Sequence, residues 1–218
     1  IDSKLVTELK TAADSVLGAQ LLAPKNSKKM LIVGAGVVAE SLVRAYHEMF
    51  PSLETISIWA RRVDQAESLV ARLADLKVNL VVAENLAEAA AQSDIISSAT
   101  MAREPVLKGE WISPGTHIDL IGAYKADMRE ADDVLISKGS IYVDSRETTL
   151  HHIGELMIPL AAGVILETDI KGDFYDLTVG EQSARTSDNE ITVFKNGGGA
   201  HLDLMIADYI ARVVSIDS

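Results

Sequence analysis

The feature that most constrains this chain is a run of small residues between a predicted strand and a predicted helix. Residues 29–34 form a short apolar segment that ends in glycine, which is typical of a buried parallel strand. The chain continues as Gly34-Ala-Gly36-Val-Val-Ala39, a G-x-G-x-x-A pattern that opens a helical periodicity. Gly34 permits a tight turn, Gly36 lets the backbone approach a pyrophosphate, and Ala39 allows close packing of helix on strand. The pattern predicts a dinucleotide-binding turn with the phosphates at the helix N-terminus.

Strand-like and helix-like segments alternate along the rest of the chain. The expected strands span 29–34, 55–59, 79–83, 95–98, 116–122, 140–144 and 191–194. The first expected helix covers about residues 3–22, and the second follows the glycine turn and ends at Pro51. Three more are expected at 64–74, at 86–91 and in a C-terminal stretch around 202–213. From residue 150 onward the pattern is less regular. Because strands that alternate with helices imply right-handed crossovers, we expect an α/β fold with a Rossmann-type, doubly wound parallel sheet covered on both faces.

Composition excludes several kinds of partner. The 218 residues include 20 Lys and Arg against 32 Asp and Glu, a net charge of −12 that disfavours nucleic acid. The longest apolar run, residues 156–166, is well short of the about 20 residues of a membrane span. Without cysteine there is no thiolate nucleophile, and the five histidines lack the spacing of paired metal ligands. We expect a cytoplasmic protein without metal, nucleic acid or membrane partners.

The end of the second predicted strand bears on the cofactor. An NAD site usually has Asp or Glu there, which holds the ribose 2′-hydroxyl. This chain has Trp59-Ala-Arg61-Arg62, and two guanidinium groups suit a 2′-phosphate. The prediction is therefore NADPH, with NADH less favoured. The alternative is that both arginines are solvated surface charges.

Two further loops follow predicted strands at the carboxyl edge of the sheet, where open α/β folds bind ligands. Thr100-Met101 follows the strand at 95–98, and Gly122-Ala-Tyr124 follows the strand at 116–122. Both loops are candidates for bordering the nicotinamide ring, and the alternative is that they are ordinary connections.

Six segments in this order resemble the ornithine cyclodeaminase/mu-crystallin family. The segments are Lys10-Thr-Ala-Ala13, Ile32-Val-Gly-Ala-Gly36, Ile58-Trp-Ala-Arg-Arg62, Ser98-Ala-Thr100 with Pro105-Val-Leu107 and Trp111, Pro114-Gly-Thr-His-Ile118 with Gly122-Ala123, and Ile191-Thr-Val-Phe-Lys195. The resemblance implies a Rossmann domain joined to a dimerising substrate domain, and hence a homodimer. Family members include ornithine cyclodeaminases, alanine dehydrogenases and ketimine reductases that act on cyclic imino acids.

The resemblance also implies three parts. Residues 1–22 form a helix that leads from the substrate and dimerisation domain, 23–175 form the nucleotide-binding Rossmann domain, and 176–218 return toward the substrate domain and the nicotinamide site. The chain begins at Ile1 rather than Met. We expect the main catalytic lysine and the carboxylate-binding arginine of the family to lie upstream of Ile1, so this stretch alone can be inactive.

Two departures from the family pattern point to the reaction. The cyclodeaminases and alanine dehydrogenases carry Asp where this chain has Tyr124, so deamination loses its base. Reduction of a C=N bond needs a hydride and one proton, and tolerates the change better. Asp127 is too far along the loop to replace the missing carboxylate. Lys10 replaces an arginine of the family, and its ammonium group can still attract a substrate carboxylate.

We therefore expect NADPH-dependent reduction of Δ1-pyrroline-2-carboxylate or Δ1-piperideine-2-carboxylate to the cyclic amino acid, with Lys10 and Tyr124 as the catalytic candidates. The alternatives are an ornithine cyclodeaminase or alanine dehydrogenase, and a non-catalytic NADPH-binding protein like mu-crystallin. The residues expected to contact the cofactor are Gly34, Ala35, Gly36, Val37, Val38, Arg61, Arg62, Ala99, Thr100, Met101, Gly122, Lys195 and Asn196.

The helix at 3–22 has an apolar stripe that needs a partner. We expect the stripe to pack on the C-terminal helix between Leu202 and Val213. Its residues are Leu5, Leu9, Ala12, Val16 and Ala19.

Overall fold

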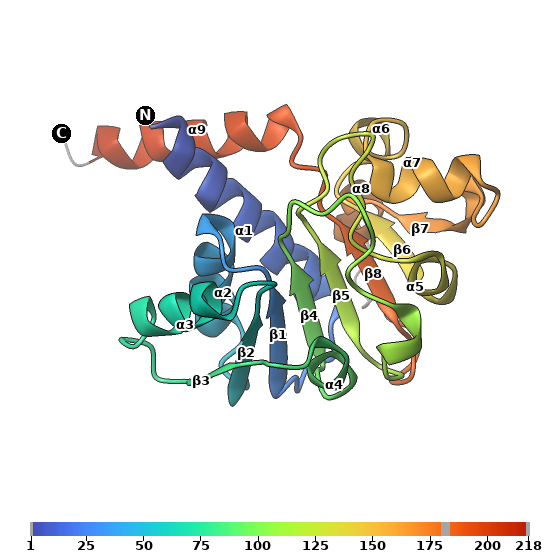
Figure 1. Cartoon of the computed structure of the whole chain (residues 1–218). Coiled ribbons are helices and arrows are strands. Elements are labelled where there is room, and N and C mark those ends of the chain that lie inside the picture. The colour runs from blue at the N-terminus through green and yellow to red at the C-terminus, as the bar shows by residue number, and fades with distance from the viewer. Residues whose placement is uncertain (1, 180–183, 217–218) are drawn as a thin grey trace.

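Eight parallel strands form one sheet with helices on both faces (Figure 1). The structure is a computed structural model that describes residues 2–179 and 184–216. The strands are β1 Lys29–Val33, β2 Thr55–Trp59, β3 Asn79–Val82, β4 Ile95–Ser98, β5 His117–Leu120, β6 Ser140–Val143, β7 Ile170–Gly172 and β8 Thr192–Lys195. The helices are α1 Ser3–Leu22, α2 Val37–Met49, α3 Val63–Arg72, α4 Leu86–Ala91, α5 Asp133–Lys138, α6 Arg146–Thr149, α7 Gly154–Ala161, α8 Phe174–Val179 and α9 Ala200–Ile216.

The strand order is β3-β2-β1-β4-β5-β8-β6-β7, and all neighbours pair in parallel. The chain therefore leaves β1 toward β2 and β3 on one side, and returns to β4 and β5 on the other. This reversal between β1 and β4 creates the crevice in which open α/β sheets bind ligands. The expected fold class is confirmed, and so are all seven expected strands.

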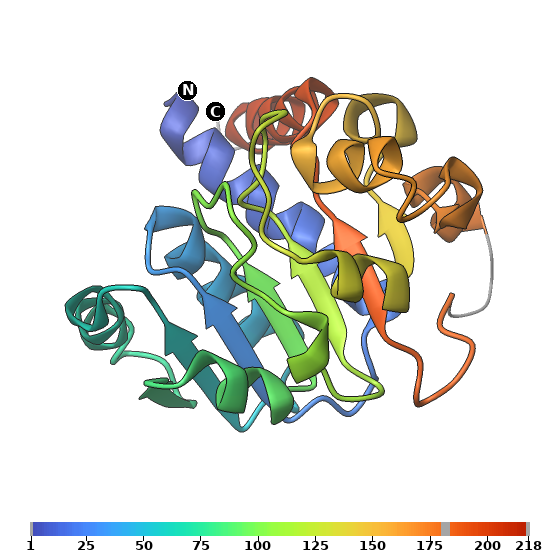
Figure 2. The same cartoon turned by 45° about the vertical axis from the view of Figure 1, so that its right-hand side comes forward.

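β1 shows why the sheet is covered on both faces. Its residues from Met30 to Val33 are all fully buried. Met30 and Ile32 join the core that lies against α1, α2 and α3, whereas Leu31 and Val33 join the core against α4 and α5. Figure 2 shows the blue α1 behind the sheet and the green α4 in front of it. A continuous apolar run is the pattern required of a strand buried on two sides.

The C-terminal half adds strands in an order that differs from their order in the chain. β8 lies between β5 and β6, so the last strand of the sequence is central in the sheet. β7 is a three-residue edge strand in the stretch where the sequence pattern is irregular. β7 is not predicted from the sequence, because three residues that end in glycine are too short to show an alternation.

The expected contact between α1 and the C-terminal helix α9 is confirmed, but the apolar stripe of α1 is only half buried, and its buried half lies in the core with α2. Ala12, Val16 and Ala19 are buried, whereas Leu5 and Leu9 are 48% and 45% exposed. The helix packs on α2, β5 and β8, and it also contacts α9. Figure 1 shows α9 near the N-terminal half of α1, so both ends of the described chain lie at one edge of the molecule. Because this half extends past the sheet, its leucines miss the core.

The inward face of α2 is also offset from the expected one. The helical spacing of Val38, Leu42, Ala45 and Met49 predicts that these residues share the inward face, yet Met49 is exposed. The buried residues of α2 are Ala39, Leu42, Val43 and Tyr46. No helix in the described ranges is long and apolar enough to cross a membrane.

Candidate functional site

Two clefts adjoin at the carboxyl edge of the sheet, and each has a volume of about 330 Å³. The outer cleft is lined by Gly34, Ala35, Gly36, Trp59, Ala60, Arg61, Arg62, Gln65, Ala99, Thr100, Met101, Ala102 and Val106. The inner cleft is lined by Thr7, Lys10, Thr11, Val38, Ala99, Thr100, Met101, Ile121, Gly122, Tyr124, Asn196, Gly197 and Gly198. The two share the loop Ala99–Met101, so a long ligand can occupy both.

The glycine turn after β1 has the geometry that a pyrophosphate needs. Gly34 has a φ of +121°, and a Cβ there would lie 2.7 Å from the Ala99 carbonyl oxygen. At Gly36 a Cβ would meet no heavy atom within 4 Å, so the space beside this backbone is open. Gly36 immediately precedes α2, whose first N–H groups have no partner inside the helix. The residues present fit the phosphates of a dinucleotide.

Arg61 and Arg62 lie at the far wall of the outer cleft. Both follow β2, both are exposed, and both line the cleft. Within the described part of the chain neither guanidinium group forms an ion pair or a hydrogen bond, so both are available to an anionic ligand.

The inner cleft brings together the two catalytic candidates, Lys10 and Tyr124. The Lys10 Nζ donates to Asp203 Oδ2 at 2.6 Å and to the Gly198 carbonyl oxygen at 3.2 Å. An ammonium group has three N–H donors, so one remains for a ligand. Tyr124 is 52% exposed, and its ring lies 5.3 Å from the Lys125 Nζ.

Asn196 also lines the inner cleft, and its side chain is held in place. Its Nδ2 donates to the Thr11 carbonyl oxygen at 3.2 Å and to Ser15 Oγ at 3.0 Å. Its Oδ1 accepts from the Gly198 N–H at 3.0 Å. The amide therefore connects α1 to the backbone that follows β8.

Lys195, Val37 and Asp127, which the sequence put forward as candidate site residues or weighed as a substitute, lie outside both clefts. Lys195 is fully buried, and its Nζ donates to the carbonyl oxygens of Leu120 and Asn196 at 2.9 and 2.8 Å. Burial lowers the pKa of Lys195, and the surrounding carboxylates oppose that shift. Val37 is exposed at the start of α2, and Asp127 forms an ion pair with Arg103 at 3.1 Å. The structure brings the other expected cofactor residues to the clefts.

The interior beneath the clefts is acidic. Burial raises the pKa of Asp14 to about 9, and the charges of Asp144 and Asp119 add to the shift. Burial likewise raises the pKa of Asp119 to about 6, although Asp119 Oδ2 accepts hydrogen bonds from Ser97 and Tyr46. The buried ammonium of Lys195 lowers the pKa of both acids.

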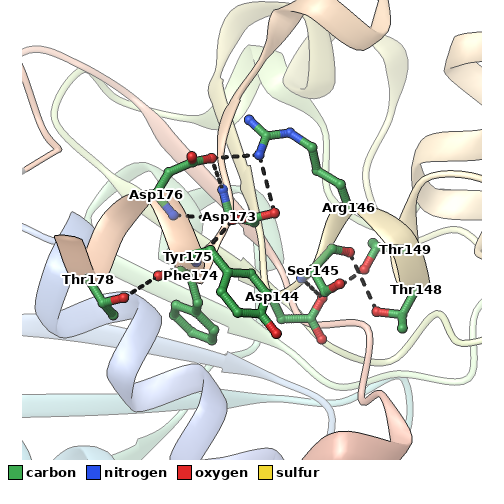
Figure 3. A network of polar contacts seen from close by, with 10 residues as sticks. All are labelled: Asp144, Ser145, Arg146, Thr148, Thr149, Asp173, Phe174, Tyr175, Asp176 and Thr178. Carbon is green, nitrogen blue, oxygen red and sulfur yellow. Dashed lines mark hydrogen bonds and ion pairs between the residues drawn. The ribbon is translucent and has the colours of Figure 1, made fainter. Parts of the chain in front are cut away.

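A network behind the inner cleft fixes the chain after β6 (Figure 3). The Asp144 carboxylate accepts from the Ser145 N–H and the Thr149 hydroxyl, each at 2.7 Å. It also accepts from the Gly197 N–H at 2.9 Å, and Gly197 lines the inner cleft. Nearby, the Arg146 guanidinium bridges Asp173 and Asp176 of the β7–α8 segment. The network therefore anchors one wall of the cleft.

Glu130 is a fully buried residue between β5 and α5 that the sequence does not mark as part of the site. Its carboxylate accepts hydrogen bonds from the loops after β4 and β5. Glu130 stands in the acidic stretch Arg129-Glu-Ala-Asp-Asp133, and nothing in that stretch separates a buried acid from a turn or cap acid.

The parallel sheet, the glycine turn and the adjoining clefts define a Rossmann-type dinucleotide-binding protein. Residues 1–215 match the model of the ornithine cyclodeaminase/mu-crystallin family, and the chain belongs to this family. The resemblance carried by the six sequence segments is thereby confirmed.

Among its relatives is the Delta(1)-pyrroline-2-carboxylate reductase of Paracoccus denitrificans, which is 60% identical over 215 residues that cover 99% of this chain and 68% of the relative. The ketimine reductase mu-crystallin of Mus musculus is 34% identical over 210 residues, covering 96% and 63%.

Two solved structures are similar throughout the chain. The Thermococcus litoralis Delta(1)-pyrroline-2-carboxylate reductase in complex with NADH and L-proline has a TM-score of 0.86 and 35% identity, covering 94% of this chain and 63% of that one. An archaeal alanine dehydrogenase dimer with bound NAD has a TM-score of 0.89 and 30% identity, covering 97% and 65%. The chain thus spans about two thirds of the length of these relatives.

Proposed function

We propose that the protein is an oxidoreductase that reduces a cyclic imino acid, Δ1-pyrroline-2-carboxylate or Δ1-piperideine-2-carboxylate, to the cyclic amino acid. The observation that carries the proposal is the lining of the inner cleft. In the described ranges this lining contains a phenol and an ammonium group but no carboxylate. A deaminase needs a base for an amine and for water, whereas imine reduction needs a proton donor. The names of the relatives from Paracoccus denitrificans and Thermococcus litoralis support the same reaction.

The residues of the inner cleft have separate roles in this proposal. When bound, a reduced nicotinamide would supply a hydride to the imine carbon and a proton would go to the nitrogen, which would give the oxidised cofactor and the saturated ring. The free N–H of Lys10 attracts the substrate carboxylate. The Tyr124 hydroxyl donates toward the imine nitrogen, because a phenol carries an O–H donor. Thr100, Met101 and Gly122 would border the nicotinamide ring of the cofactor.

We propose NADPH as the preferred cofactor. The guanidinium groups of Arg61 and Arg62 at the wall of the outer cleft form no ion pair with any described residue, and this supports the choice. Solved relatives with NADH or NAD support a nicotinamide cofactor in general.

We also propose that the protein works as a cytoplasmic homodimer. The archaeal alanine dehydrogenase described as a dimer supports the assembly. In this proposal residues 23–175 form the nucleotide-binding domain, while 1–22 and 176–218 connect it to the substrate domain.

The proposed function is tested with full-length protein and two substrates. NADPH oxidation with Δ1-pyrroline-2-carboxylate and ammonia release from ornithine are measured under the same conditions. We expect NADPH consumption with the imine and no ammonia. Ammonia release at a rate that matches imine reduction would restore the cyclodeaminase alternative. Tight NADPH binding without turnover of either cyclic imine would favour the non-catalytic alternative.

The role of the phenol is tested with Tyr124→Phe. We expect kcat for imine reduction to fall by about 10²-fold, because a positioned proton donor contributes about 10² to 10⁴ to a rate. Tyr175→Phe is the control, since this exposed tyrosine lies on α8 outside both clefts. An unchanged kcat in Tyr124→Phe would remove the phenol from the mechanism.

A further inference from the structure

Two loops meet at the wall that the clefts share. One follows β4 and contains Thr100, and the other follows β5 and contains Gly122. A Cβ at Gly122 would lie 1.9 Å from the Thr100 carbonyl oxygen and 2.4 Å from the Thr100 nitrogen. The two backbones therefore pass so close that only glycine fits. Because both loops line the inner cleft, their relative position determines its shape.

One buried carboxylate holds the two loops together. Glu130 Oε1 accepts from the Ser98 hydroxyl at 2.7 Å, the Thr100 N–H at 2.8 Å and the Thr100 hydroxyl at 2.7 Å. Glu130 Oε2 accepts from the Gly122 N–H at 2.6 Å and the Ala123 N–H at 3.3 Å. All five partners are donors, and a carboxylate is the side chain that can accept from all of them.

The backbone at Glu130 is itself held by a second buried carboxylate. The Glu155 carboxylate on α7 accepts from the Glu130 N–H at 2.7 Å and from the Ala131 N–H at 2.9 Å. Glu130 and Glu155 are both fully buried. Burial raises the pKa of Glu155, and the neighbouring charge of Glu130 adds to the shift. Such a fully bonded and buried arrangement is rigid.

We propose that Glu130 is a positioning residue, whose carboxylate sets the placement of Thr100 against Gly122 and so aligns the nicotinamide with the imine. The alignment with the imine rests on the proposed function of imine reduction. The five bonds reach only β4 and the loops after β4 and β5. The glycine turn at 34–36 and the arginines after β2 receive none of them.

This separation predicts different effects at the two ends of the cofactor. In Glu130→Gln one accepting oxygen becomes an NH₂ group, which cannot accept and must face donors. The loops at the shared wall then move apart, while the phosphate and adenine end of the outer cleft keeps its contacts. Binding of the nicotinamide half should weaken, and binding of the other half should not.

The experiment compares two ligands in the full-length Glu130→Gln variant. One ligand is NADPH, and the other is 2′-phospho-ADP-ribose, which has the same phosphates but lacks nicotinamide. We expect the Kd of NADPH to rise at least fivefold and the Kd of the fragment to stay within twofold. With the imine, kcat should fall at least tenfold while KM changes less. Glu54→Gln is the matched control, because Glu54 is exposed and pairs with Lys28 outside both clefts.

Several outcomes would overturn the proposal. One is an equal loss of affinity for both ligands, because this would indicate a general structural role. Another is a variant with unchanged kcat and unchanged Kd for both ligands. Glu130→Asp keeps the charge on a shorter side chain and should partly restore kcat. If neither variant folds, the carboxylate is required by the fold rather than by the cleft, and the proposal is wrong. The binding comparison needs no imine, so an unmutated protein that fails to reduce imines removes only the proposed function.

Discussion

Single residues at the wall of the outer cleft carry the proposed cofactor choice. Arg61 and Arg62 are exposed and unpaired within the described residues, so a 2′-phosphate would gain charge-assisted hydrogen bonds without breaking existing ones. Such bonds contribute about 1.5 to 3 kcal/mol each, and solvent screening at exposed groups reduces that value.

The double variant Arg61→Ala with Arg62→Ala should therefore bind NADPH at least tenfold more weakly and NADH almost unchanged. Fluorescence titration with both cofactors measures this difference. Arg72→Ala is the control, because its guanidinium pairs with Glu40 on α2 and lies outside both clefts. Equal titration curves for the two cofactors in the unmutated protein would contradict the choice of NADPH.

His117 gives the protein a defined acid sensitivity. It is fully buried at the start of β5, and its Nδ1 lies 2.9 Å from Thr192 Oγ1. Burial lowers the pKa of His117 from 6.5 to about 3, and the charge of Arg185 adds to the shift. Because the unfolded chain binds the proton more readily, the stability from the neutral imidazole is complete above about pH 6.5 and is lost as the pH falls toward 3.

Thermal unfolding between pH 7 and pH 4.5 tests this sensitivity. One proton changes the free energy of unfolding by at most about 1.4 kcal/mol per pH unit. His117→Gln cannot take up this proton, so its melting temperature should fall less steeply with acid than that of the unmutated protein. His152→Gln, at an exposed position, should keep the original slope. Coinciding slopes for His117→Gln and the unmutated protein would contradict the prediction.

At the scale of elements, α1 offers a contrast between the two halves of one helix face, because Leu9 and Val16 belong to the same stripe. Val16 is 4% exposed and packs in the core that contains the buried residues of α2. Leu9, two turns earlier, is 45% exposed. In this chain Val16→Asp should cost roughly 3 kcal/mol of the free energy of unfolding, because it buries an unpaired charge.

Leu9→Asp is the matched control and should cost less than about 1 kcal/mol, as exposed substitutions do. Urea unfolding of the two variants measures both values. Equal losses would show that the exposed half of α1 has a partner that its burial does not indicate.

At the scale of the whole molecule, the clefts couple cofactor binding to stability. The lining residues come from both halves of the sheet. They lie on α1, α2 and α3, at the end of β2, and in the segments that follow β1, β2, β4, β5 and β8. A ligand at 100 times its Kd adds about 2.7 kcal/mol to the stability of the folded state. For a chain of this length NADPH should raise the melting temperature by roughly 5 to 10 °C. With a Kd that is tenfold higher, the double arginine variant should lose about half of this rise at the same NADPH concentration. No rise with NADPH or NADH would contradict dinucleotide binding.

The sequence alone determined the turn after β1, seven of the strands and the parallel architecture. These are local properties: a glycine that must adopt positive φ, an apolar run buried on both faces, and helical periodicity between strands. The same local patterns correctly predicted that Arg61, Arg62 and the Thr100 loop lie at one edge of the sheet, because the carboxyl ends of parallel strands meet there.

Only the tertiary structure decided which side chains reach the clefts. β8 lies between β5 and β6, and this insertion buries Lys195 in the sheet although its neighbour Asn196 lines the inner cleft. Glu130 bonds to Ser98, 32 residues away, and no local pattern connects the two. Strand order and long-range hydrogen bonds depend on which segments pack together. Neighbouring side chains of a strand point to opposite faces of the sheet, and the strand order decides what each face contacts.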